Sequence, residues 1–186
     1  MVREPGSVGR PRVSSRDTIE EAAAELFLEQ SYAGTTIDEI TQRAGVSRAT
    51  FFNYFGSKSD LLWIDADRAI TSLSDCLGAG MGVFDAIERA ASEVGPERVP
   101  LAVTQSDVMG TREELVASGL ARVALVTSRI RSALAAESGE DRRSLGLNVR
   151  TNSLAGAIIA AWGAWIVGGI DRRPLAEYVR EALALV

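Results

Sequence analysis

The chain contains no histidine and only one cysteine, Cys76. Without histidine the usual zinc sites and histidine acid–base catalysis are excluded, and a single cysteine cannot form a disulfide within the chain. The carboxylates of Asp65, Asp67 and Asp75 are the remaining candidates for catalysis, but their helical spacing does not bring two of them together as an acid–base pair. We therefore expect no catalytic residue, no metal site and no cofactor, and an enzyme is the least favoured class of function.

The chain also lacks a long uninterrupted apolar segment. The longest one, residues 155–170, contains glycines and falls short of the roughly 20 residues that span a bilayer. Residues 1–15 contain no apolar stretch of the kind that a signal peptide requires. We expect a cytoplasmic protein with no membrane partner. Its 186 residues, 46% of them hydrophobic, suffice for one or two domains with a packed core.

Positive charge is scarce and unevenly placed. The chain has 20 Lys and Arg against 25 Asp and Glu, which argues against a surface coated with basic groups. Two windows nevertheless contain cations and no acids, one between Glu4 and Asp17 and one between Glu39 and Asp60. The cations of these windows are Arg10, Arg12, Arg16, Arg43, Arg48 and Lys58. We interpret Arg43 as surface charge, and the first two arginines either as an arm for the minor groove of DNA or as a disordered tail.

Helical periodicity begins at Ser14 or Ser15, each of which suits a helix N-cap. Ile19, Ala22, Ala23, Leu26, Phe27 and Gln30 follow a 3.6-residue period and share one face of this first helix. After a break at residues 32–35, Thr36 and Glu39 have the spacing of a capping box and open a second helix that ends at Ala44. Gly45 supplies a left-handed stop, and Ser47 caps a third helix over residues 48–55.

Further helices are predicted along the rest of the chain. Ser57 and Asp60 form another capping box at the start of a long fourth helix. The later helices are predicted near 83–93, 98–109 and 111–137, from Asp141 or Arg142 to about 168, and from Pro174 onward. The sequence thus predicts an all-α fold of about nine helices without a strand. We divide it into a basic flexible tail (1–13), a head (14–57) and a larger body (58–186).

Residues 35–62 have the layout of a helix-turn-helix motif, with two short helices around a tight turn at Gly45. The apolar side chains of the motif are expected to pack against Leu26 and Phe27; they are Ile37, Ile40, Ala44, Val46, Phe51 and Phe55. The side chains left on the outer face of the third helix are Ser47, Arg48, Ala49, Thr50, Asn53 and Tyr54. Arginine can read guanine, asparagine can read adenine, and Lys58 at the start of the next helix suits a phosphate.

The segments IEEAAAELFLEQ, YAGTTIDEI, AGVS and TFFNYFGSKSDLL resemble the head of the TetR family of bacterial transcriptional regulators over roughly residues 14–64. The chain departs from the family pattern at Ser31, where glycine is usual, and at Thr41, where alanine is usual. A serine with a left-handed backbone would cost roughly 1 kcal/mol, so the first helix is expected to end differently. The resemblance implies DNA contacts for Thr36, Arg48, Ala49, Thr50, Phe52, Asn53, Tyr54 and Lys58.

Each of these residues also has a purely structural interpretation. Ser47, Thr36 and Ser57 act as helix caps whether or not they touch a phosphate. Phe52 is compatible with the core as well as with a DNA contact. Arg48, Asn53 and Tyr54 are also compatible with an ordinary solvated helix face.

The resemblance further implies a homodimer formed through the last two helices, which would place two third helices about one DNA turn apart. Apolar stripes on these helices are compatible with this role, or with the core of a single chain. They consist of Leu154, Ala155, Ile158, Ala161, Trp162 and Trp165 on one helix and Leu175, Tyr178, Val179, Ala182 and Leu183 on the other.

The family also encloses an effector pocket between the fourth helix and the later helices of the body. The polar candidates in this chain are Gln105, Thr127 and Asn152. The apolar candidates are Trp63, Ala66, Ile70, Leu73, Leu101, Met109, Val123, Ile130 and Trp162. The stretch DLLWIDAD resembles the subgroup associated with mycofactocin gene clusters, whose regulator responds to long acyl thioesters, which implies an apolar effector.

The function expected from these features is a ligand-responsive regulator that binds double-stranded operator DNA, a repressor that a small apolar effector releases. The alternative is an architectural or adaptor protein that binds DNA and has no small-molecule effector. The sequence leaves the operator, the regulated genes and the effector open.

Overall fold

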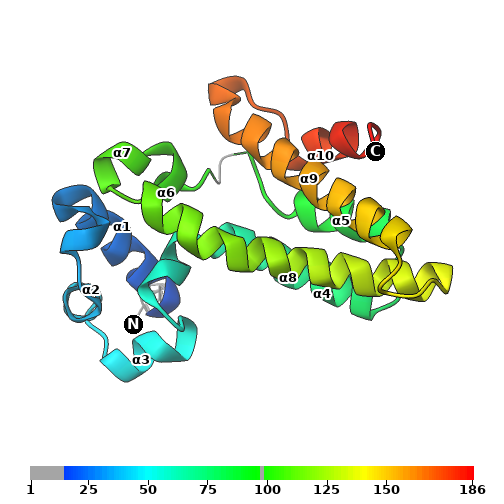
Figure 1. Ribbon diagram of the computed structural model, residues 1–186. Coiled ribbons are helices and arrows are strands. Elements are labelled where there is room, and N and C mark those ends of the chain that lie inside the picture. Colours follow the sequence, from blue (N-terminus) through cyan, green and yellow to red (C-terminus); the bar gives the residue numbers. More distant parts are fainter. Residues whose placement is uncertain (1–14, 97–98) are drawn as a thin grey trace, which may run out of the picture.

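The computed structural model describes residues 15–96 and 99–186. In this part of the chain, ten α-helices and two short 3-10 helices account for the regular structure, without a strand. Figure 1 shows the helices of the N-terminal segment, drawn in blue and cyan, gathered at one end, and long helices that lead from there to a second group containing the C-terminus. The predicted all-α fold is confirmed. The predicted tail, with Arg10 and Arg12, lies outside the described residues.

The head consists of α1 (Ser15–Gly34), α2 (Ile37–Ala44) and α3 (Arg48–Tyr54). Thr36 and Glu39 form the expected capping box, in which the Thr36 hydroxyl accepts from the Glu39 N–H and the Glu39 carboxylate accepts from the Thr36 N–H. Gly45 ends α2 with a φ of 67°, a left-handed conformation that glycine adopts without steric cost. These local signals fix the helix ends and hence the angle between α2 and α3.

The core of the head contains the side chains expected from the sequence. Ile40, Phe51 and Phe55 are buried against Leu26 and Phe27, whereas Ile37, Ala44 and Val46 are partly buried at the edge of the same cluster. The aromatic rings of Phe51 and Phe55 lie 5.6 Å apart, and Phe27 packs edge-on against Tyr32 at 5.2 Å. This packing makes α3 a rigid platform for its exposed face.

The end of α1 is kinked at Ser31, which has a φ of 69° and a ψ of 162°. Serine therefore adopts the positive φ that glycine would take at lower cost, and helical turns continue beyond it to Gly34 instead of breaking at residue 32 as predicted. The Ser31 carbonyl accepts a hydrogen bond of 2.8 Å from the Thr35 hydroxyl, and its hydroxyl accepts one of 3.4 Å from Gly34 N–H. These bonds hold the kinked backbone.

The body begins with the 3-10 helix η1 (Lys58–Leu62), so that the predicted fourth helix starts with a tighter turn before α4 (Ile64–Gly78). The helices that follow are α5 (Val83–Ser92), α6 (Leu101–Thr104), α7 (Ser106–Met109), α8 (Arg112–Ser138), α9 (Leu145–Val167), η2 (Gly169–Asp171) and α10 (Leu175–Leu183).

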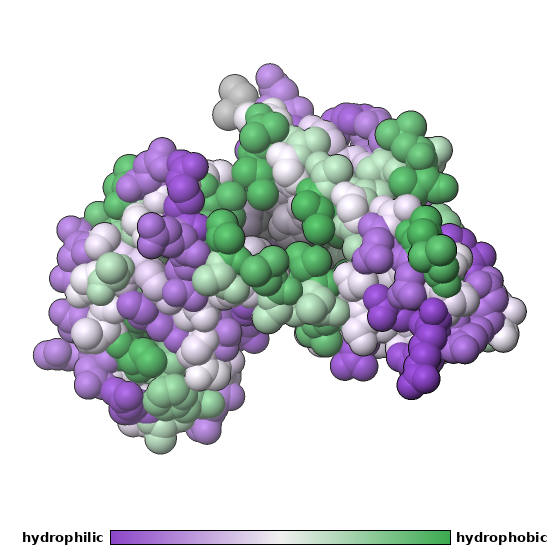
Figure 2. All heavy atoms as spheres, in the orientation of Figure 1, coloured by the Kyte–Doolittle hydropathy of each residue, from purple (hydrophilic) through white to green (hydrophobic). Residues whose placement is uncertain are grey.

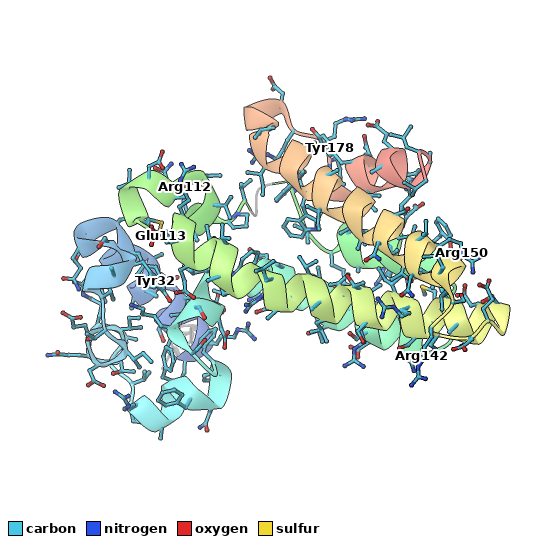
Figure 3. The ribbon with its side chains drawn as sticks, viewed as in Figure 1. Tyr32, Arg112, Glu113, Arg142, Arg150 and Tyr178 are labelled. Atoms are coloured by element: carbon cyan, nitrogen blue, oxygen red, sulfur yellow. The ribbon has the colours of Figure 1, made fainter. Side chains whose placement is uncertain are left out.

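Two predicted boundaries in the body were wrong. The helix expected over 98–109 is divided at Gln105 into α6 and α7. The helix expected from Asp141 or Arg142 begins after Ser144, whose hydroxyl accepts from the Leu147 N–H and caps α9. The preceding residues form a turn, beyond which Arg150 pairs with Glu140 near the far end of the body (Figure 3).

The apolar stripes of the last two helices lie mainly inside the chain. On α9 the residues Leu154, Ala161 and Trp165 are buried, and on α10 the same holds for Leu175, Val179 and Leu183. They form one core together with α5, α4 and Ile130 of α8. The interpretation of these stripes as the dimer interface was therefore wrong for most of their residues, because α9 and α10 pack on each other, with α8 against α9 and α5 against α10.

No helix in the two described ranges is long and apolar enough to cross a membrane. Within the same ranges, no cluster of three or more Cys, Asp or Glu side chains is arranged to hold a metal ion. Asp67, one of the carboxylates considered for catalysis, is paired with Arg122.

Candidate functional site

The outer face of α3 carries the polar and aromatic side chains predicted to contact DNA. Ser47 is the N-cap of this helix and accepts the Thr50 N–H at 3.0 Å, so the first turn of α3 is well ordered. Thr50 is half-buried, and Thr36, at the start of α2, is exposed. The other exposed residues of the predicted set are Ser47, Arg48, Ala49, Phe52, Asn53 and Tyr54. Ser47 and the exposed residues of α3 thus form an accessible surface of the head, the α3 face.

Arg48 is held on the α3 face by two neighbours. Its guanidinium pairs with Asp38 of α2 and lies 5.5 Å from the centroid of the Phe52 ring. The side chains of Arg48 and Asp38 are 58% and 74% exposed, and exposed pairs of this kind contribute only about 0–1 kcal/mol. A base edge can therefore replace Asp38 as the partner of Arg48 at little cost.

Lys58 has a structural role that the sequence did not indicate. Its Nζ donates to the carbonyl oxygens of Tyr32 and Thr35, both at 2.7 Å, and lies 4.0 Å from the centroid of the Tyr32 ring. Burial lowers the Lys58 pKa, against the opposing effect of Glu114 and Glu39. Burial also raises the pKa of Tyr32, which is labelled in Figure 3, to about 12. Lys58 therefore ties the start of η1 to the end of α1.

An ammonium group has three N–H donors, and the two carbonyls leave one of them for a phosphate. Lys58→Met is expected to weaken binding to all duplex DNA by a similar factor and to lower the salt slope by about one unit per half-site. The loss of both carbonyl contacts is also expected to destabilise the fold by about 1–3 kcal/mol.

These effects are measured by DNA titration at several salt concentrations and by urea unfolding. The matched control is Arg43→Met, which removes one charge from the same head, where Arg43 pairs with Glu25 and Glu29 on the surface. A Lys58 variant that loses stability but retains its DNA affinity and salt slope contradicts the phosphate contact and leaves only the structural role.

The body contains an apolar cavity of about 560 Å³ between α4, α5, α8 and α9. Its volume lies in the range typical of small-molecule sites. Figure 2 shows the corresponding hollow in the middle of the molecule, rimmed by hydrophobic side chains. Exposed apolar residues at its rim include Val116 and Leu120 of α8 and Ile159 of α9. The cavity is therefore accessible from one side.

Part of the predicted effector set surrounds this cavity. The predicted residues that line it are Trp63, Ala66, Ile70, Leu73, Val123 and Trp162. Their contact with an effector stays a prediction. They come from α4, α8 and α9 together with the turn before α4, as expected from the sequence.

The remaining predicted residues do not line the cavity. Gln105 is exposed between α6 and α7, and Ile130 is fully buried in the core of the body. The Thr127 hydroxyl donates to the Val123 carbonyl, and the exposed Asn152 donates to the Asn148 carbonyl. The polar side chains that we expected in the cavity therefore turn toward their own helices or toward solvent, since their helix faces point away from it.

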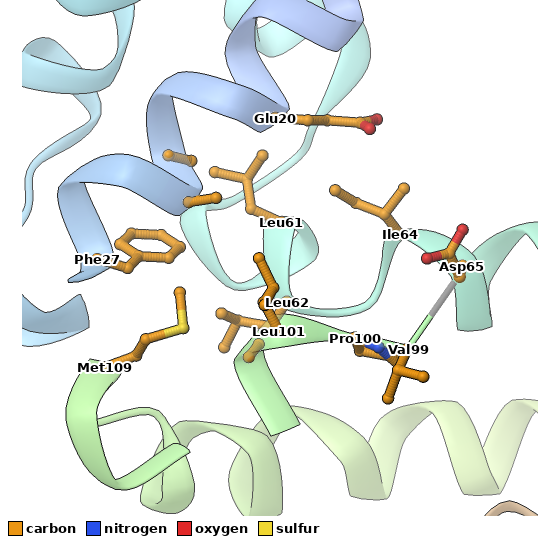
Figure 4. A pocket seen from close by; sticks show the side chains of 13 residues that line it. Glu20, Phe27, Leu61, Leu62, Ile64, Asp65, Val99, Pro100, Leu101 and Met109 are labelled. Atoms are coloured by element: carbon orange, nitrogen blue, oxygen red, sulfur yellow. The ribbon is translucent and has the colours of Figure 1, made fainter. Parts of the chain in front are cut away.

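Leu101 and Met109 border a second, smaller cavity of about 210 Å³ where the head meets the body. Figure 4 shows Phe27 and Met109 at one end of it and the carboxylates of Glu20 and Asp65 toward the other. Glu20 pairs with Arg16 at 2.8 Å, and Arg68 contacts both Glu20 and Asp65 at 3.5 and 3.3 Å. Their negative charge is thus already balanced.

Sequence reasoning missed most of the contribution of α8 to the large cavity. Val116, Gly119, Leu120 and Arg122 line it in addition to the predicted Val123. The spacing of the first three, at i, i+3 and i+4, is a helical signal that was available in the sequence. Arg122 gave no such signal, because its partners Asp60 and Asp67 are far away along the chain.

Residues 19–62 match the sequence model of the tetR family of bacterial regulatory proteins. The HTH-type transcriptional regulator HbdR from Aromatoleum sp. is 27% identical over 184 residues, which cover 92% of this chain and 78% of HbdR. The putative mycofactocin biosynthesis transcriptional regulator MftR from Mycobacterium tuberculosis is 33% identical over 70 residues. This second match covers 38% of this chain and only 35% of MftR, so it is confined to part of both proteins.

Two solved structures have the same fold. One is the transcriptional repressor FadR from Thermus thermophilus in complex with lauroyl-CoA, with a TM-score of 0.52, 24% identity, and coverage of 91% of this chain and 92% of FadR. The other is a transcriptional regulator from Aquifex aeolicus, with a TM-score of 0.55, 20% identity, and coverage of 92% and 99%. At these identities the likeness establishes the fold alone.

Proposed function

We propose that the chain is a transcriptional repressor of the tetR family, whose binding to operator DNA is weakened by a small apolar ligand. The observation that carries the proposal is the placement of the large cavity beside the helix that follows the head. Trp63, which lines the cavity, immediately precedes α4 and comes only nine positions after the last residue of α3, Tyr54. A ligand in the cavity thus lies next to the segment that orients the α3 face.

The DNA-binding part of the proposal is supported by the α3 face. Its exposed arginine and asparagine have the hydrogen-bonding groups that read guanine and adenine in the major groove. The tyrosine hydroxyl and the capped helix N-terminus are suited to phosphate oxygens. We propose that Thr36, Ser47, Arg48, Ala49, Thr50, Phe52, Asn53, Tyr54 and Lys58 form this interface.

The chemistry of the cavity favours a neutral apolar group as its occupant. Arg122 is the one charged residue among the described residues that line it, and its guanidinium already pairs with Asp60 and Asp67. A ligand carboxylate would have to compete with two protein carboxylates for this group. A long acyl chain fits such a wall better, and the repressor FadR, which has the same fold, forms a complex with lauroyl-CoA. Any polar part of the ligand would then remain at the open rim.

We propose that the chain acts as a homodimer through the outward faces of its last two helices. The face of α9 opposite to the core carries small and apolar residues at helical spacing, namely Val149, Gly156, Ala160 and Val167. All of them are exposed in the single chain. A second copy packed on this face would bury them and would place two heads on one side of the dimer.

Operator affinity with and without a ligand tests the proposal. A duplex selected from a random library with the purified chain serves as operator, and acyl-CoA thioesters of increasing chain length serve as ligands. A ligand that quenches tryptophan emission is expected to weaken operator binding at least about 5-fold, and the operator is expected to weaken ligand binding by the same factor. Equal operator affinities with and without such a ligand contradict ligand control and favour a DNA-binding protein without an effector.

A further inference from the structure

Arg122 connects three segments of the chain at the wall of the cavity. From α8 its Nε and Nη2 donate to the two oxygens of Asp67 on α4, both at 2.7 Å. Nη2 also contacts Asp60 Oδ1 in η1 at 3.2 Å, and Nη1 donates to the Ser118 carbonyl at 3.2 Å. The Arg122 side chain is only 15% exposed, so solvent weakens these contacts less than it weakens surface pairs. The guanidinium thus joins α8 to both α4 and η1.

Asp60 in turn holds the segment that follows α3. Its Oδ2 accepts the backbone N–H groups of Gly56 at 2.9 Å and Ser57 at 3.1 Å. Its Oδ1 accepts the Ser57 hydroxyl at 3.1 Å, beside the contact with Arg122. Gly56 lies two residues beyond the end of α3, so Asp60 holds the backbone directly after α3, where the chain passes from the head to the body.

Trp63 connects the same arginine to the interior of the cavity. The Arg122 guanidinium lies 5.2 Å from the centroid of a Trp63 ring, and the indole N–H donates to the Ser118 hydroxyl at 2.8 Å. The indole also packs on Gly119, where an added Cβ would lie 3.0 Å from it. Gly119 and Arg122 therefore leave no room for the indole of Trp63 to move toward α8. A ligand that displaces the indole must also move Arg122 or α8.

We infer that Arg122 couples occupation of the cavity to the mobility of the backbone at residues 56–60. When a ligand displaces Trp63, the contact between Arg122 and Asp60 breaks. This inference rests on the proposed function, because it takes the cavity as the effector site. The distances decide which contact yields. Asp67 accepts two hydrogen bonds of 2.7 Å from Arg122, whereas Asp60 accepts a single one of 3.2 Å from the same guanidinium. Arg122 stays on α4, and residues 56–60 become free to move with the head.

The test uses the full-length chain without DNA and N-phenyl-1-naphthylamine, a neutral apolar dye, as the probe. Probe binding is followed by dye fluorescence, and exchange of the Gly56 and Ser57 amide hydrogens is followed by NMR. Saturating probe is expected to accelerate this exchange about 5-fold or more, since both amides donate to Asp60. Arg122→Met is expected to abolish the response, because in this variant Asp60 has lost its contact with residue 122 even without the probe. Asp67→Asn, a milder change, is expected to reduce the response at least by half.

The control is Arg112→Met, which removes an exposed arginine at the start of the same helix, where it pairs with Asp107. This variant is expected to respond like the unmodified chain. Two results overturn the inference while leaving the effector site in place. In one, the probe binds without changing the exchange of the Gly56 and Ser57 amides; in the other, the Arg122 and Asp67 variants respond as strongly as the unmodified chain. A probe that does not bind contradicts the apolar effector site, and the inference falls with it.

Discussion

Replacing Phe51 with Ala is expected to destabilise the chain by about 3–5 kcal/mol, whereas the same change at the neighbouring Phe52 is expected to cost about 0.5 kcal/mol. Phe51 is fully buried, and its ring lies 5.3 Å from Phe52 and 5.6 Å from Phe55. Its removal leaves a void between α1, α2 and α3 that the rigid head cannot fill. Phe52 is 45% exposed on the α3 face and loses much less contact area.

Urea unfolding followed by circular dichroism measures both losses, and the Phe52 variant is the matched control for removal of one ring. Phe51→Ala is expected to lose DNA binding because the head unfolds. Phe52→Ala is expected to stay folded, so a fall in its DNA affinity can be attributed to the interface. Equal losses of stability in the two variants contradict this division of the aromatic pair between core and surface.

The head was predictable because its signals are local. The capping box of Thr36 and Glu39, the glycine at position 45 and the cap at Ser47 each lie within a few residues of the helix end that they fix. Phe51 and Phe55 are four positions apart and therefore share one helix face. Short connections then leave the three helices few ways to pack. Once the buried side chains of α3 are known, the remaining side chains of this helix can be predicted to be exposed.

The body was less predictable because its long helices carry apolar residues on more than one side. On α8, Ile130 is fully buried, whereas Val116 and Leu120 are exposed at the rim of the cavity. Hydrophobicity alone therefore does not give the rotation of α8 about its axis, and Thr127 was placed in the cavity wrongly. The stripes of α9 and α10 were ambiguous for a related reason, since an apolar face looks the same whether a helix of the same chain or a second copy covers it.

The roles of Lys58 and Arg122 depend on contacts between distant parts of the chain. Lys58 binds the carbonyl oxygens of Tyr32 and Thr35, backbone groups that every residue has and that no sequence pattern marks. Arg122 reaches Asp60 and Asp67 only because α8 packs along η1 and α4. Such contacts follow from the tertiary fold, so they appear only once the packing of the helices is known.

The other large effect is expected at the DNA interface, where Arg48→Ala and Asn53→Ala should each weaken binding to the selected operator by about 1–3 kcal/mol per contact. Each side chain lies exposed on the α3 face, and each can form a bidentate contact with one base, guanine for arginine and adenine for asparagine. A dimer reads two half-sites, so every substitution removes the contact twice. Binding to random duplex is expected to change little, because phosphate contacts dominate it.

Parallel titrations of the selected operator and of a random duplex, at one salt concentration, separate base reading from contact with the backbone. Arg43→Ala is the control for Arg48→Ala, since it removes the same charge from a residue of the head that is held by Glu25 and Glu29. Selecting new operators with the Arg48 and Asn53 variants then shows which base each residue reads, because preference should relax at that position alone. An equal loss on both duplexes assigns the residue to the DNA backbone, and unchanged affinity for the operator removes it from the interface.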